Sequence, residues 1–159
     1  MNKDFSENVC MREALAQARR AFLLGEVPVG AVVLYENQII SRAHNEVELR
    51  CDPCAHAEIL AIQRASSELG TWRLNGASLF VTLEPCTMCI GAAVLARISN
   101  LFFGCSDPRQ GAVGSLYDLS SHCSLPHTIN VVSEVLEAEC RELLTNFFAT
   151  KRKSVETLK

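Results

Sequence analysis

The sequence lacks any apolar stretch long enough to cross a bilayer. One of its longest purely apolar runs extends only from Met88 to Ala96, whereas a membrane-spanning helix needs about 20 residues. The first residues, Met1 to Phe5, also lack the apolar core that a secretory signal peptide requires. From these two absences we expect a cytoplasmic protein with no membrane partner.

A strong excess of one charge is also absent, because the formal net charge is only −3. The distribution is uneven, however: the segment from Arg141 to Lys159 contains five basic residues and two acidic ones, a local balance of +3. A short basic end on an acidic body is a modest signal for a polyanionic partner. A solvated helix end, where cations are favoured by the helix dipole, explains the charge about equally well.

Repeats, low-complexity segments and linkers are absent too. A length of 159 residues without a linker predicts a single domain over residues 1–159, with a basic helix end and tail over about 147–159. The chain has eight cysteines, but without an export signal we expect reduced thiols, some of them bound to metal, rather than disulfides.

The spacing of apolar residues predicts helices that alternate with strands. The predicted helices cover residues 7–24, 55–69, 87–96 and 135–151, and the predicted strands cover 30–35, 38–43, 78–83, 101–104 and 128–132. The first two strands are separated only by Glu36-Asn37, which is typical of a hairpin. This alternation indicates an α/β fold whose sheet is covered by helices on both faces.

Two short motifs carry the chemistry. His56-Ala57-Glu58 is followed, thirty residues after the histidine, by Pro85-Cys86-Thr87-Met88-Cys89. One imidazole and two thiolates make three zinc ligands, and a catalytic site leaves the fourth position to water. We therefore expect one Zn²⁺ per subunit, held by His56, Cys86 and Cys89. A His-x-Glu motif followed by Pro-Cys-x-x-Cys is also the signature of zinc-dependent base deaminases.

Helix starts explain how these side chains reach one metal. Residues two apart do not share a helix face, so the histidine and the glutamate cannot both point one way from mid-helix. Pro53 favours a helix that begins just after it, which places both residues in the first turn. Pro85 likewise opens the next helix and puts the two cysteines one turn apart, where the helix N-terminus favours the thiolate form.

The predicted chemistry is hydrolytic deamination. Zinc lowers the pKa of bound water towards about 7. Glu58 is predicted to take the proton of that water, deliver it to a ring nitrogen and then protonate the departing amine. The reaction yields a carbonyl and ammonia and needs no organic cofactor.

A closed structural zinc site is the main rival interpretation. Cys51 and Cys54 form a second Cys-x-x-Cys pair, which could complete four thiolate ligands with the later pair. The separation from Cys54 to Cys86 is longer than the usual spacing between such pairs. The rival also gives His56 and Glu58 no role, so we favour the catalytic site.

The segments around the zinc motifs resemble the bacterial tRNA-specific adenosine deaminases, of the cytidine and deoxycytidylate deaminase superfamily. The resemblance extends from about residue 9 to residue 153, and the segments that carry it are 26–33, 52–58, 83–92, 107–115 and Phe147-Phe148 with the basic residues that follow. It implies a cytidine deaminase-like three-layer α/β/α sandwich around a mixed five-stranded sheet. It also implies a homodimer that converts adenosine to inosine at the wobble position of a tRNA anticodon stem-loop.

The resemblance also implies roles for residues outside the zinc motifs. Asn45 is expected to hydrogen-bond the inserted base or its sugar, although it could instead cap the hairpin end. Asp107 is expected to contact the neighbouring nucleotide, although an aspartate before proline is also a natural turn former. The remaining expected substrate contacts are Pro28 and Val29 at the base, and Lys151 and Arg152 at phosphates.

Two other functions stay open at this point. One is deamination of a free base or nucleotide, of the guanine or cytosine type, on the same scaffold. The other is a zinc-stabilised RNA-binding module without catalysis, in which Glu58 would have no chemical role.

Overall fold

A mixed five-stranded sheet forms the centre of the molecule in a computed structural model, which describes residues 6–156 and the side chains of residues 6–152. The strands are β1 (Gly30–Tyr35), β2 (Gln38–His44), β3 (Ser78–Leu83), β4 (Asn100–Cys105) and β5 (Asn130–Val132), in the order β2-β1-β3-β4-β5. β1 is antiparallel to both β2 and β3, whereas β3, β4 and β5 are parallel.

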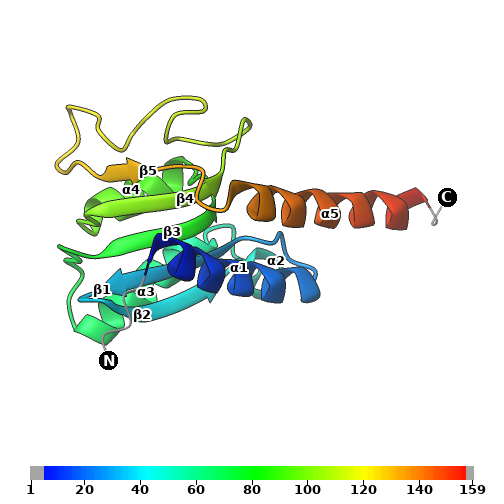
Figure 1. The fold of residues 1–159 in the computed structure, drawn as a ribbon, viewed down its shortest axis with the longest axis horizontal. Coiled ribbons are helices and arrows are strands. Elements are labelled where there is room, and N and C mark those ends of the chain that lie inside the picture. Colours follow the sequence, from blue (N-terminus) through cyan, green and yellow to red (C-terminus); the bar gives the residue numbers. More distant parts are fainter. Residues whose placement is uncertain (1–5, 157–159) are drawn as a thin grey trace.

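Helices cover both faces of this sheet, as Figure 1 shows. α1 (Glu7–Leu23) and α5 (Glu137–Glu156) lie on one face, and α3 (Ala57–Leu69) and α4 (Thr87–Leu95) lie on the other. The short helix α2 (Val47–Arg50) lies between β2 and α3. The predicted three-layer α/β/α sandwich with a mixed five-stranded sheet is therefore confirmed.

Alternation along the strands divides the core in two. Leu79 and Val81 of β3 pack into the cluster under α3 and α4, whereas Phe80 between them packs with α1 residues such as Met11 and Leu15. Successive side chains of a strand point to opposite faces, so each layer of helices has its own apolar contact with the sheet.

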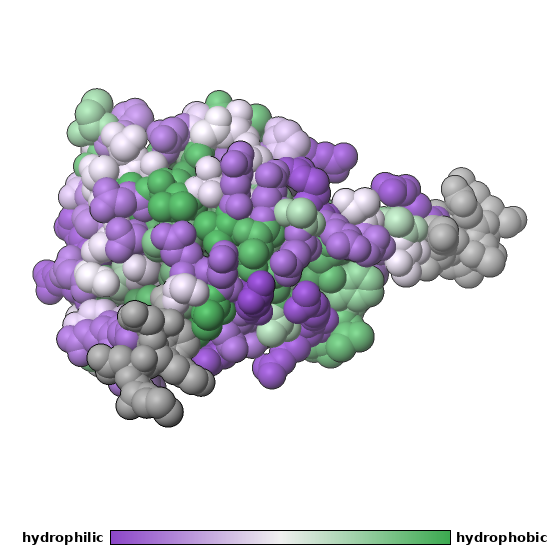
Figure 2. Space-filling view, in the orientation of Figure 1, coloured by the Kyte–Doolittle hydropathy of each residue, from purple (hydrophilic) through white to green (hydrophobic). Residues whose placement is uncertain are grey.

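The layer of α1 and α5 leaves part of the sheet accessible. Figure 2 shows a hydrophobic band across the middle of this face, with hydrophilic side chains around it.

α1 itself lies very close to β1: a Cβ added at Gly30 would stand 2.0 Å from the carbonyl oxygen of Ala14. The glycine is therefore required for this helix–strand approach. None of the helices within residues 6–156 has the length and apolarity to cross a membrane.

Several element bounds differ from the predicted ones. The predicted hairpin is confirmed, and Glu36 and Asn37 both adopt the positive φ of a tight two-residue turn. α3 begins at Ala57, two residues later than predicted, because His56 is still extended with φ −70° and ψ 151°. α5 begins at Glu137 rather than at residue 135, since Leu136 also has a positive φ. It continues to Glu156, beyond the predicted end, and the predicted tail residues 157–159 lie outside the described residues.

The carboxyl ends of β3 and β4 create the setting for the site. These strands are parallel neighbours, and Leu83 pairs with Cys105 at their ends. The chain then leaves β3 through Glu84 and Pro85 into α4, and leaves β4 into a long connection to β5. Ligands of α/β sheets generally bind in the crevice outside the carboxyl ends of parallel strands. The motif from Pro85 to Cys89 therefore begins where a site is expected.

Candidate active site

His56, Cys86 and Cys89 form a cluster of three possible metal ligands. Their ligand atoms all lie within 4.8 Å of one another. The imidazole Nδ1 of His56 is 3.7 Å from the sulfur of Cys86 and 3.4 Å from the sulfur of Cys89. A tetrahedral zinc with ordinary bond lengths separates nitrogen and sulfur ligands by roughly 3.5 Å. The distances and the donor types therefore fit a zinc ion.

Helix N-termini hold two of these ligands. His56 is the residue that caps α3, and Cys86 caps α4 with φ −76° and ψ 174°. Cys89 follows one turn later within α4, where it is fully buried. The prediction that the ligands gather at strand-to-helix corners is confirmed, and the partial positive charge of each helix start favours anionic ligands there.

The thiols of Cys86 and Cys89 differ in pKa. A hydrogen bond from Cys89 lowers the pKa of the Cys86 thiol to about 4, and the neighbouring His56 acts in the same direction. The same hydrogen bond and burial raise the pKa of Cys89. The hydrogen bond with Cys86 in turn raises the pKa of His56. Metal ligands must be deprotonated, so a divalent cation that binds here would displace the protons that Cys89 and His56 retain.

Glu58 lies beside the cluster as the second residue of α3. Its side chain is buried, and burial raises its pKa to about 7. A carboxyl group with a pKa near neutrality exchanges protons readily at the pH of the cell, which is the property that a general acid and base needs. The burial of Glu58 and its place beside the cluster therefore suit it to proton transfer.

A cavity of about 670 Å³ opens at this cluster, a volume within the usual range for small-molecule sites. Its wall runs from the segment around Glu26 across α3 and the start of α4 to the exposed side of α5. The predicted site residues on the wall are Val29, Asn45, His56, Glu58, Cys86, Asp107 and Arg152.

The other predicted substrate residues take different places. Pro28 is buried next to Val29 but is not on the cavity wall. The ammonium group of Lys151 lies 5.4 Å from the ring centre of Phe147, a cation–π contact on another side of α5 from Arg152. Only Arg152 of the two basic residues therefore borders the cavity.

The four-thiolate alternative is wrong. Cys51 and Cys54 are both exposed, and neither belongs to the ligand cluster found within the described residues. Cys51 ends α2 in a left-handed conformation, and its thiol donates only to the carbonyl of Glu48. The Cys-x-x-Cys spacing here reflects a turn rather than a metal site.

Glu26 is a residue of the cavity wall that the sequence did not reveal. Its buried carboxylate accepts a hydrogen bond from the side-chain amide of Asn45, 3.1 Å away. It also accepts from the backbone N–H groups of Glu48 and Leu49 in α2. Glu26 therefore fixes the amide group of Asn45 with its N–H side turned to the carboxylate.

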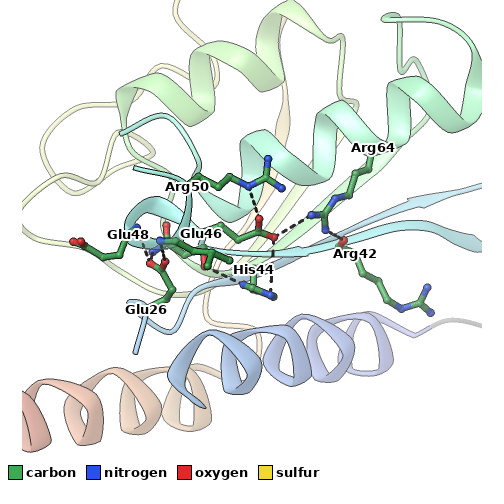
Figure 3. A network of polar contacts seen from close by, with 9 residues as sticks. Glu26, Arg42, His44, Glu46, Glu48, Arg50 and Arg64 are labelled. Carbon is green, nitrogen blue, oxygen red and sulfur yellow. Dashed lines mark hydrogen bonds and ion pairs between the residues drawn. The ribbon is translucent and has the colours of Figure 1, made fainter. Parts of the chain in front are cut away.

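Glu46 anchors the same segment from the other side, as Figure 3 shows. Its buried carboxylate accepts hydrogen bonds from Arg50 of α2 and from Arg64 of α3, with a distance of 3.0 Å to Arg64. The imidazole of His44 lies 4.0 Å away. Because Arg64 also donates to the carbonyl of Arg42, the network joins β2, α2 and α3 around the residue next to Asn45.

We expect Glu46→Gln to lower the free energy of unfolding by about 1–3 kcal/mol at pH 7, because two charge-assisted hydrogen bonds lose their anion. Burial acts to raise the pKa of Glu46, but the hydrogen bonds from Arg50 and Arg64 outweigh it and leave that pKa below its ordinary value of 4.5. Since the folded-state pKa is lowered, the stabilisation is complete above pH 4.5 and is lost as the pH falls through the folded-state pKa.

Urea denaturation of both proteins between pH 7 and pH 3.5 measures this effect. The difference in unfolding free energy between the parent and Glu46→Gln should shrink towards zero at the acid end. His44, Arg50 and Arg64 are the ionisable groups that face the carboxylate, and the variant retains all three. A difference that stays constant over this range would contradict a stabilising ion pair at Glu46.

The comparisons with known proteins agree with this site. The family model of the MafB19-like deaminases matches residues 5–152. The tRNA-specific adenosine deaminase of Bacillus subtilis (strain 168) is 48% identical over 147 residues, which cover 92% of this chain and 91% of that relative. The shared family thus extends over nearly the whole sequence rather than the zinc motifs alone.

Solved structures show the same fold. One from biochemical and structural studies of A-to-I editing by tRNA A34 deaminases at the wobble position is 44% identical, with a TM-score of 0.83 over 85% of this chain and 98% of that chain. A guanine deaminase from Nitrosomonas europaea has a TM-score of 0.75 over 91% of this chain and 85% of that chain, but at 23% identity it shares the fold alone. The chain is a deaminase and belongs to the tRNA-specific adenosine deaminase family.

Proposed function

We propose that this enzyme converts adenosine to inosine at the wobble position of a tRNA anticodon. The observation that carries the proposal is the combination of His56, Cys86, Cys89 and Glu58 at one end of a cavity that continues along α5 as far as Arg152. A free base would occupy only the inner end of such a cavity, which is the end beside the cluster of His56, Cys86 and Cys89. A base presented by a nucleic-acid loop would use the inner end and the outer wall together.

The proposed cofactor is one zinc ion per subunit. His56, Cys86 and Cys89 would hold it, and their distances and donor types suit zinc. When bound, zinc supplies a water that loses a proton near neutral pH. Three protein ligands leave room for that water, which is typical of catalytic rather than structural sites.

Glu58 moves the protons in the proposed reaction. Its carboxylate accepts a proton from the attacking water and transfers it to the ring nitrogen next to the amine-bearing carbon. It then takes the remaining proton from the hydroxyl group on the tetrahedral carbon and passes it to the departing amine, which leaves as ammonia as the carbonyl forms. The near-neutral pKa that burial gives Glu58 supports both directions of transfer. A base must leave the stack of its neighbours to reach this depth, which is possible in a single-stranded anticodon loop.

The proposed substrate contacts surround this centre. Asn45 would hydrogen-bond the base or its sugar, and its contact with the buried Glu26 supports a fixed orientation. Pro28 and Val29 would shape the apolar side of the base pocket. Asp107 would contact the neighbouring nucleotide, and Lys151 and Arg152 would meet phosphates at the end of α5.

We also propose that the enzyme is a cytoplasmic homodimer whose two subunits both contact the anticodon stem-loop. Exposed apolar side chains support a further partner surface, among them Leu49 and Leu95, which are 67% and 66% exposed. An interface between subunits would cover apolar side chains of this kind. Light scattering at micromolar concentration would report the mass of a dimer or of a single chain.

A comparison of substrate classes tests the proposed function. The zinc-loaded enzyme is incubated separately with an anticodon stem-loop RNA, adenosine, guanine and cytosine, and released ammonia is measured. Release from the RNA alone supports the proposal. Release from guanine or cytosine, but not from the RNA, would assign the enzyme to small-molecule deamination instead.

A further inference from the structure

Glu84 is a buried carboxylate that the proposed chemistry does not use. It follows β3 directly and is only 2% exposed. Burying an ionised carboxylate is costly unless hydrogen-bond donors surround it. Every donor that Glu84 receives comes from one segment, residues 107–115, which lies more than twenty positions further along the chain.

The donors reach both ends of that segment. The backbone N–H of Asp107 donates to Oε2 of Glu84 at 2.9 Å. The backbone N–H groups of Val113 and Ser115 donate to Oε1, each at 3.0 Å, and the hydroxyl of Ser115 donates to Oε2. Burial alone raises the pKa of Glu84, but these hydrogen bonds outweigh it and lower that pKa below its ordinary value.

The backbone is shaped to admit this carboxylate. A Cβ added at Gly111 would stand 2.3 Å from the carboxyl carbon and from one oxygen of Glu84. The same segment is joined to the metal corner by a bridge between Gly111 and Cys86, and by a hydrogen bond from the N–H of Ala112 to the carbonyl of Pro85. Glu84 therefore lies between the start of α4 and the segment 107–115.

The anchored segment forms one wall of the cavity, from Asp107 to Gln110. Oδ1 of Asp107 accepts from the N–H groups of Arg109 and Gln110 and so closes a local turn. With one oxygen used within the turn and its own N–H held by Glu84, Asp107 has a defined orientation at the cavity. Its second carboxylate oxygen is the one available to a substrate.

We infer that Glu84 is a positioning residue, which sets the wall of Asp107 to Gln110 at a fixed place relative to the Cys86 corner. The inference rests on the proposed function, because the wall matters for binding the nucleotide beside the target base. Glu84 touches neither the substrate nor the reacting atoms. It acts through the N–H of Asp107, so its loss should weaken substrate binding more than it slows the chemical step.

Glu84→Gln tests whether Glu84 affects substrate binding rather than the chemical step, because it replaces a single oxygen of the side chain by nitrogen. A glutamine offers one oxygen and one amide nitrogen where the carboxylate offers two oxygens. If the oxygen keeps the N–H groups of Val113 and Ser115, the nitrogen faces the N–H of Asp107, which then has no acceptor. The hydroxyl of Ser115 can turn to accept from the new amide. Only the Asp107 end of the wall should therefore be released.

The experiment compares the zinc-loaded parent, Glu84→Gln and a control, Glu68→Gln, which changes an exposed glutamate of α3. Amide hydrogen exchange by NMR is measured with kcat and KM for the anticodon stem-loop RNA. We expect the Asp107 amide of Glu84→Gln to exchange at least about 10-fold faster, and KM to rise about 10-fold. The expected kcat and zinc content stay near the parent values, and the control matches the parent throughout.

Exchange at Asp107 that is the same in Glu84→Gln as in the parent would overturn the inference. If the parent forms inosine, a KM of Glu84→Gln equal to that of the parent would overturn it too. A fall in kcat with an unchanged KM would overturn it as well, by giving Glu84 a part in the chemical step. If the parent forms no inosine, the proposed function fails, and the exchange rates still decide whether Glu84 anchors the wall. Should Glu84→Gln not fold, Glu84→Asp withdraws the carboxylate from the N–H of Asp107 by one methylene, and KM and Asp107 exchange values equal to the parent would refute the anchor.

Discussion

Glu58→Gln is expected to reduce the rate of inosine formation by about 10³-fold, within the range that general acid–base catalysis usually contributes. The substitution keeps the size of the side chain but removes the group that accepts and returns the proton. Glu58 lies within α3 next to the cluster and is not one of the three grouped ligands. The zinc content of the variant should therefore remain close to that of the parent.

Single-turnover kinetics with metal analysis of the same sample measures this effect. Single turnover isolates the chemical step from product release. Glu68→Gln, in an exposed position of the same helix, is the matched control and should retain the parent rate. A variant that loses its zinc together with its activity would place Glu58 among the residues that hold the metal and would contradict its role as the proton carrier alone.

Cys86→Ala is expected to lose both zinc and detectable deamination. With one thiolate removed, His56 and Cys89 alone provide two ligands, too few for the three-ligand site typical of catalytic zinc. Metal that binds only the folded chain also stabilises it, by about 4 kcal/mol when its concentration is 1,000 times the dissociation constant. The variant should therefore lack the stabilisation that zinc confers on the parent.

Thermal unfolding with and without a chelator tests this prediction, together with the zinc content of each purified protein. Cys54→Ala is the matched control, since Cys54 is exposed and outside the ligand cluster. It should bind zinc and respond to the chelator as the parent does. Loss of zinc from Cys54→Ala as well as from Cys86→Ala would restore the four-thiolate interpretation.

Three buried glutamates of the site region differ in the hydrogen-bond partners of their carboxyl groups and in the direction of their pKa shifts. Burial raises the pKa of Glu58 to about 7, and the surrounding donors do not compensate. Glu46 and Glu84 are also buried, but arginines and N–H groups respectively leave their pKa values lowered. One glutamate can therefore exchange protons, while the other two remain ionised and hold the segments around the cavity in place.

Local sequence patterns predicted the layers and the helix starts that carry the candidate ligands well, because both depend on short-range signals. Pro85 places Cys86 at the start of α4, as the motif indicated, whereas α3 starts two residues later than predicted and leaves His56 just before the helix. The strand at residues 78–83 was predicted with its observed bounds, since most of its residues are apolar and it lies in the middle of the sheet. These features are set by residues that are neighbours in the sequence.

The supporting contacts could not be predicted in the same way. Glu46 meets Arg64 across 18 positions, and Glu84 meets Ser115 across 31. Nothing in the local spacing of these residues indicates a partner. The position of Glu84 between an apolar strand and Pro85 was a usable signal, since an acidic residue at a buried strand end needs donors. α2, with four residues, was too short to give a periodic pattern.

Conversion of the wobble adenosine is tested most directly by one measurement. The zinc-loaded enzyme is incubated with a full-length tRNA transcript bearing an ACG anticodon, and nuclease fragments are examined by mass spectrometry. We expect inosine at the first anticodon position with the parent and none detectable with Glu58→Gln. A tRNA left without inosine by a folded, zinc-loaded enzyme, or inosine at another position, would contradict the proposed activity.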